Sequence, residues 1–238
     1  MSKRYIYGII AAVVLIIAAV LISTVSSRNK TPVISLPSPP ANGNSSELGS
    51  DENSLDVTAE TVCSALKILN RTENYSRTYT VKTLWEGGES EESISVWQKG
   101  DKVRMTISGK NKTKNLLILG DELYIWYDNS VGFLKTTLDK EGYSSADSFA
   151  RLITYEELFD TAPEDITDAG YVDKLNQPCI FAEYISDGDY VNRIYVSVDT
   201  GLLVASEKLK NGKEVITMAT TSTELITPAD SVFAVPAT

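Results

Sequence analysis

The chain has 238 residues, a formal net charge of -10 at pH 7 and no histidine. Without histidine, Ser-His-Asp, Cys-His and His-zinc sites are excluded. Beyond residue 46 the chain carries 18 basic and 32 acidic residues, so binding to nucleic-acid phosphates or to acidic lipid head groups is not expected.

The first predicted element is an uncharged apolar segment at residues 5–25, YIYGIIAAVVLIIAAVLISTV. About 20 apolar residues let an α-helix cross a membrane, whereas the apolar core of a secretory signal has only about 7–15. The residues that follow offer poor cleavage sites, and no cysteine lies nearby for lipid attachment. We therefore predict a signal anchor, an integral single-pass transmembrane helix in the cell membrane. The alternative is a cleaved, secreted form.

The flanking residues predict the orientation and the domain boundaries. Residues 1–4 include Lys3 and Arg4 and form the predicted cytoplasmic tail, because positive charge favours the cytoplasmic side. Residues 26–54 are rich in Ser, Pro, Asn and Gly, which predicts a disordered tether. Residues 55–238 are long enough for one extracytoplasmic domain with its own core.

A helix is predicted near residues 57–71, because its apolar residues recur at helical spacing. From Tyr75 the apolar residues alternate with polar ones, which predicts antiparallel strands. A second helix is predicted within residues 144–160, capped by Ser145 or Asp147. The predicted strands cover residues 75–85, 93–99, 102–108, 115–119, 122–127, 133–138, 169–175, 179–185, 192–198, 202–209 and 214–222.

These elements predict an α+β fold. Its main part is a single long curved antiparallel sheet, and the N-terminal helix and the mid-domain helix cover one side of it. Several strands, such as residues 122–127, are apolar on both faces, so both faces need a cover.

Two stretches near the C-terminus resemble the LolA-like family of lipoprotein carriers and its lipid-binding relatives of the LppX and LprG type. One is YVSVDTGLLVASEKLKNGKEVITM, and the other is the tail TPADSVFAVPAT with Asp230, Ser231, Phe233 and Pro236. The resemblance implies a half-barrel with helices across its open side. It also implies an apolar cup for acyl chains, or a surface that holds another protein.

The expected function is a membrane-tethered extracytoplasmic domain that holds an apolar ligand, such as a lipid or acyl chain, or an envelope protein partner. The alternative is a regulatory docking module for a cell-wall or sporulation and germination enzyme, with no internal ligand. Met and aromatic side chains can line an apolar pocket, although they also fill cores. The candidates for the hydrophobic cup are Trp97, Met105, Trp126, Phe133, Phe181 and Tyr184.

Other motifs predict no catalytic residue, metal site or cofactor. Ser64 and Lys67 have the Ser-x-x-Lys spacing of penicillin-recognising enzymes, but the other motifs of that class are missing. The acidic turn at residues 187–189 lacks further calcium ligands. A hydrolase that uses two carboxylates remains a rival without a visible pair. Cys63 and Cys179 could form one disulfide outside the cytoplasm, or they could be two free thiols.

Overall fold

A computed structural model describes residues 56–138, 146–150, 152, 154–186 and 188–235 of the chain. These residues belong to one compact unit, Asp56–Thr238. The predicted anchor at residues 5–25 and the predicted tether at residues 26–54 lie outside the described residues. In the part that is described, no helix has the length and apolar character needed to span a membrane.

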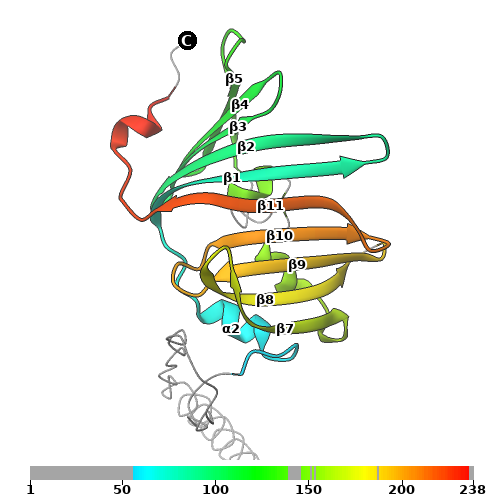
Figure 1. Ribbon diagram of the computed structural model, residues 1–238. Helices are drawn as coiled ribbons and strands as arrows, with labels where there is room; N and C mark the ends of the chain where they lie inside the picture. Colours follow the sequence, from blue (N-terminus) through cyan, green and yellow to red (C-terminus); the bar gives the residue numbers. More distant parts are fainter. Residues whose placement is uncertain (1–55, 139–145, 151, 153, 187, 236–238) are drawn as a thin grey trace, which may run out of the picture. The chain divides into compact units, whose positions relative to one another are not determined.

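Eleven strands of the described residues form one antiparallel sheet, in the order β6-β5-β4-β3-β2-β1-β11-β10-β9-β8-β7 (Figure 1). The sheet consists of two meanders, one of β1 to β6 and one of β7 to β11, and they join where β1 pairs with β11. The strands are β1 (Asn74–Trp85), β2 (Gly88–Lys99), β3 (Lys102–Ser108), β4 (Thr113–Leu119), β5 (Glu122–Tyr127), β6 (Leu134–Thr137), β7 (Ile166–Lys174), β8 (Gln177–Ser186), β9 (Tyr190–Ser197), β10 (Leu203–Lys210) and β11 (Lys213–Glu224).

The predicted single antiparallel sheet is confirmed, and β3 and β5 have the predicted bounds. The first hairpin is longer than expected, because β2 already begins at Gly88. Only Glu86 and Gly87 form the turn, and Gly87 has a φ of 84°, which a glycine adopts without strain.

The helices are shorter than predicted. The N-terminal helix α2 (Val62–Ile68) has seven residues, and it buries Val62, Ala65 and Leu66. The mid-domain α-helix is wrong: the described residues form three 3₁₀ turns, η1 (Ala146–Ala150), η2 (Tyr155–Asp160) and η3 (Pro163–Asp165).

The reason for this difference lies in two polar residues. Thr154 is extended, with φ -98° and ψ 149°, and it begins η2 with a reciprocal capping box to Glu157. Asp147, one of the two expected caps, instead forms an ion pair with Arg77 of the sheet. The apolar spacing that suggested one helix still describes burial, because Leu152 is 4% exposed and Leu158 is 0% exposed.

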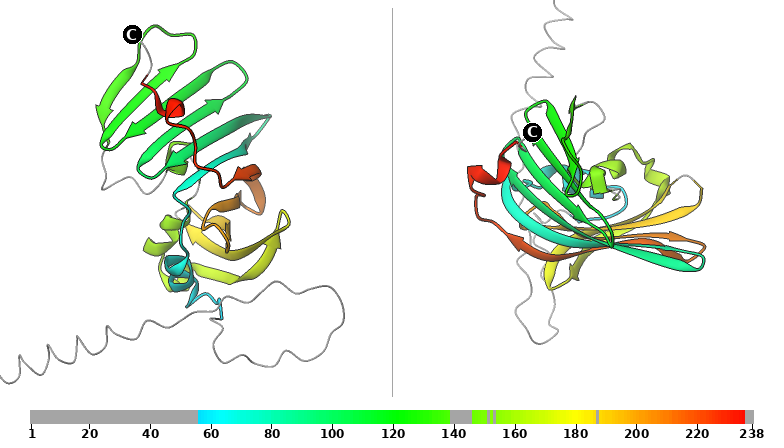
Figure 2. Two further views of the ribbon diagram at one scale, coloured as in Figure 1. Left: turned by 90° about the vertical axis from the view of Figure 1, so that its left-hand side faces the viewer. Right: turned by 90° about the horizontal axis from the view of Figure 1, so that it is seen from above.

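The sheet is curved, and its two faces are covered by different segments (Figure 2). We call the face that carries Tyr75 and Arg77 the inner face, because the crossover from β6 to β7 packs against it. Within this cover, Cys63 of α2 donates to the carbonyl of Leu158 in η2. The opposite, outer face is crossed by the C-terminal turn η4 (Asp230–Phe233).

Candidate functional site

Two of the six candidate cup residues, Met105 of β3 and Tyr184 of β8, lie on the inner face. Each is only 1% exposed. The register places Met105 beside Leu116 and Tyr184 beside Asn192. Tyr184 Oη and Asn192 Oδ1 are buried without a hydrogen-bond partner among the described residues. The inner face therefore contains these two candidates as tightly packed residues.

Three other candidates lie on the outer face, in a hydrophobic cluster under η4. We call this cluster the outer aromatic cluster. Its centre contains Leu117 and Tyr124 at 0% and 5% exposure, and Phe233 of η4 packs on them. Arg104 lies over the ring of Trp126, with its Cζ 4.2 Å from the ring centroid. The cluster residues outside η4 are Trp97, Leu117, Leu119, Tyr124 and Trp126 of the sheet, and Phe133 of the loop before β6.

The sixth candidate, Phe181 of β8, also lies on the outer face but on the other meander. Its ring packs against Tyr195 of β9 at a centroid distance of 5.2 Å. The six residues are thus divided between two faces and do not line one cup.

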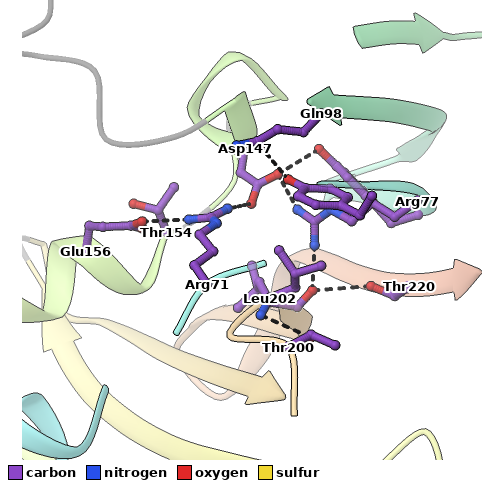
Figure 3. Close-up of polar contacts among 12 residues, drawn as sticks. Arg71, Arg77, Gln98, Asp147, Thr154, Glu156, Thr200, Leu202 and Thr220 are labelled. Carbon is purple, nitrogen blue, oxygen red and sulfur yellow. Dashed lines mark hydrogen bonds and ion pairs between the residues drawn. The ribbon is translucent and has the colours of Figure 1, made fainter. Parts of the chain in front are cut away.

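The inner face and the crossover are joined by a buried polar network (Figure 3). Arg77 of β1 forms an ion pair with Asp147 of η1, and its Nη1 donates to the carbonyl of Leu203 at 2.8 Å. Tyr79 Oη donates to Asp147 at 3.3 Å. Arg71 donates to the second Asp147 oxygen at 3.2 Å and to Glu156 of η2 at 2.8 Å. The network therefore joins β1 to two of the three 3₁₀ turns.

At Asp147, the effect of charge pairing on the pKa outweighs the effect of burial. Burial alone would raise the pKa of Asp147, but the positive charges of Arg77 and Arg71 hold it below its ordinary value. Burial raises the pKa of Glu156, and Arg71 only partly offsets this effect. The pKa of Tyr79 is well above its ordinary value, because the hydroxyl is buried and faces Asp147. At neutral pH, Asp147 is charged and Tyr79 is a neutral donor.

This arrangement is suited to holding the crossover in place. The Asp147 carboxylate accepts hydrogen bonds from Arg71, Arg77 and Tyr79, and both arginines are ion-paired. The network therefore has the form of a structural clamp. Sequence reasoning missed the clamp, although a signal was present. Arg77 occupies the same alternation face as Tyr75, Tyr79 and Val81, and an arginine on the apolar face of a strand needs a buried partner.

One pocket lies at the edge of the inner face, with a volume of about 370 Å³. Its apolar lining residues are Val103, Ile118 and Leu138, and its polar ones include Gln98 and Asp101. Tyr75 Oη donates to Gln98 at 2.9 Å, which fixes the amide at the pocket wall. A volume of this size accommodates part of an apolar chain or a small polar molecule.

The two cysteines are free thiols in this structure, so the disulfide that the sequence left open is not formed here. Cys179 Sγ donates to the carbonyl of Gln177, and Cys63 Sγ donates to the carbonyl of Leu158 in η2. Burial raises the pKa of Cys179 to about 11, so this thiol is protonated and unreactive at neutral pH. The part of the chain that the structure describes contains no group of three or more residues arranged to hold a metal ion.

No protein-family model matches the chain, and no curated protein matches it in sequence. The comparison with solved structures finds chains of low sequence identity and partial structural similarity. A chain of the Pseudomonas aeruginosa MucA/MucB complex is 15% identical, with a TM-score of 0.48, and the match covers 75% of this chain and 61% of that one.

An uncharacterized conserved protein from Thermus thermophilus is 9% identical, with a TM-score of 0.48 over 75% of this chain and 94% of that one. A LolA superfamily protein from Nitrosomonas europaea is 12% identical, with a TM-score of 0.36 over 74% of this chain and 97% of that one. A LolA superfamily protein, from the family that the sequence resembles, is therefore among the solved structures to which this chain is similar. The side chains of this chain decide what it can bind.

Proposed function

We propose that this chain is a membrane-tethered extracytoplasmic docking domain that holds an envelope protein partner on its surface. The observation that carries the proposal is the closed inner face. Asp147 and Glu156 fasten the crossover to Arg77 and Arg71, and large inner residues such as Met105 are almost fully buried. A ligand that needs a deep apolar cup would have to break this clamp, whereas a protein partner can bind outside it.

The outer face supports the same proposal. An aromatic cluster on a sheet surface is typical of a protein-binding site, because aromatic side chains bring large contact areas at low entropic cost. Among the residues that the structure describes, a short C-terminal segment covers the cluster. No reaction is assigned to the domain, and the anchor at residues 5–25 would keep it beside its partner at the membrane.

A second candidate function is favoured by the pocket of about 370 Å³ at the edge of the inner face. Val103 and Ile118 give it an apolar floor, which would suit one end of an acyl chain. In this case the domain would hold a lipid without opening the clamp.

The two functions are separated by native mass spectrometry of the full chain, expressed in a bacterial envelope and extracted in mild detergent. Co-purification of a stoichiometric envelope protein is expected for the docking domain. A bound lipid mass with no protein partner would instead support the second candidate and contradict the first.

The proposed location is tested separately on intact cells. Protease added outside the cells is expected to remove the domain from the membrane fraction by cutting the tether. Protection of the domain until the cells are lysed would place it in the cytoplasm and contradict the proposed orientation.

A further inference from the structure

The outer aromatic cluster has an occupant that belongs to the same chain. Residues 225–235, which we call the tail strap, follow β11 and cross the outer face through η4 (Figure 2). Phe233 is 5% exposed and packs with Leu117 and Tyr124, and Val232 packs beside it. Pro228 is buried as well. The strap therefore shows how a short peptide sits on this surface.

The polar contacts of the strap define a second requirement. Asp230 lies 2.9 Å from the Nζ of Lys99 and 3.3 Å from the Nζ of Lys102. These lysines flank the β2–β3 turn, so one carboxylate is held at the end of the hairpin while the ring three residues later enters the cluster. The strap thus presents to this surface a carboxylate followed three residues later by an aromatic side chain.

Several features make the strap replaceable. The Asp230 side chain is 69% exposed, and ion pairs between exposed groups contribute little. Leu225 and Ile226 are 57% and 72% exposed, so the start of the strap makes little contact with the domain. The turn η4 has only four residues and no side-chain hydrogen bond at its N-cap. Most of the strap's attachment is therefore the burial of one ring and two smaller apolar side chains.

We propose that the outer aromatic cluster is the peptide-binding surface of the domain, and that the tail strap is its resident intramolecular occupant. A partner segment with the same chemistry, an acidic residue followed three residues later by an aromatic one, exchanges with the strap. This inference rests on the proposed docking function and names the surface and the kind of segment that the partner presents.

The test uses the purified full chain in mild detergent and a fluorescein-labelled peptide, ITPADSVFAV, with the sequence of residues 226–235. The strap competes with this peptide from within the same molecule, where its effective concentration is high. Phe233→Ala weakens the competitor, so the peptide is expected to bind this variant at least about ten-fold more tightly than wild type. Ser231→Ala, at an exposed position of the strap, is the matched control and should bind like wild type.

The peptide itself supplies a second control. A peptide with alanine in place of the phenylalanine should bind the Phe233→Ala variant more weakly by about ten-fold or more. A peptide with lysine in place of the aspartate should bind it more weakly by about three-fold or more. Equal binding of all three peptides would overturn the proposed recognition.

Tryptophan fluorescence reports where the peptide binds. Trp97 and Trp126 belong to the cluster, and the third tryptophan, Trp85, is 55% exposed on the first hairpin. Phe233→Ala should shift the emission to longer wavelength, because water reaches the cluster, and the peptide should reverse the shift. Binding without this reversal would place the peptide elsewhere and overturn the inference.

A second variant keeps the test valid if Phe233→Ala does not fold, as judged by circular dichroism. Asp230→Ala removes only exposed ion pairs, so it leaves the core intact and should raise peptide affinity by about three-fold. Failure of the peptide to bind folded Asp230→Ala and Phe233→Ala more tightly than wild type would overturn the inference. Capture of an envelope protein in the mass spectrometry experiment would then still support docking through another surface, such as the exposed edge strand β7.

Discussion

At the scale of single residues, the ion pair of Arg77 and Asp147 determines how firmly the inner face is closed. The Arg77 side chain is 0% exposed and that of Asp147 is 4% exposed. Asp147→Asn keeps the shape but leaves the buried guanidinium without its negative partner, so the free energy of unfolding should fall by about 3–5 kcal/mol. Urea unfolding measures this loss. Asp173→Asn, on the exposed part of β7, is the control and should change little. A loss below about 1 kcal/mol for Asp147→Asn would mean that the clamp does not hold the crossover.

The same carboxylate gives the stability a defined dependence on pH. The pKa of Asp147 is lower in the folded than in the unfolded state, so its contribution is fully present above about pH 4 and is lost as the pH falls further. Glu156 acts in the opposite direction, because burial raises its folded pKa. Unfolding free energy is measured against pH for wild type and for Asp147→Asn. The difference between the two curves isolates the contribution of Asp147. The difference in unfolding free energy should shrink as the pH falls below about 4, and a constant difference would contradict the lowered pKa.

At the scale of elements, the loop between β9 and β10 positions Arg71 for the network. Gly201 has a φ of 64°, and a Cβ at this position would lie 2.8 Å from the Cα of Arg71. Gly201→Ala should therefore cost about 2–4 kcal/mol, through backbone strain together with a clash that the main chain must relieve. Gly212→Ala is the matched control, because its φ of 73° brings the strain but nothing lies within 4 Å of the added carbon. Thermal unfolding should separate the two variants, and equal losses would show that the close approach to Arg71 is unimportant.

Strands such as β1 and β3 were predictable because one face of each is buried and the other is more exposed, so that apolar and polar residues alternate along the sequence. The faces of the candidate site were predictable in part. The two-residue turn between β2 and β3 pairs Trp97 with Arg104, so Trp97 lies opposite the face of Met105. Pairing the residues of β2 and β3 outward from this turn would have placed Trp97 on the face opposite the predicted cup. The ion pair of Asp147 could not be predicted in this way, because its partner Arg77 lies 70 residues away in the sequence and only the folded chain brings them together.

At the scale of the whole domain, the two meanders depend on the seam between β1 and β11. Ala219 of β11 pairs with Thr80 of β1 on one side and with Ala205 of β10 on the other. No periodicity in the sequence predicts the pairing of β1 with β11, because these strands are far apart in the chain. A further link between the meanders is the crossover, with its clamp at Asp147. The two halves should therefore unfold together only while the seam is intact.

Ala219→Pro tests this dependence, because proline removes a backbone donor from a central strand and should cost about 3 kcal/mol or more. The three tryptophans all lie in β1, β2 and β5, so fluorescence follows one meander while far-UV circular dichroism follows both. In wild type the two urea transitions should coincide. In Ala219→Pro they should separate, whereas Ala219→Val keeps the donor at the same exposed position and should leave them together. Coincident transitions in the proline variant would show that contacts outside the seam, such as the clamp, are enough to make the two meanders one cooperative unit.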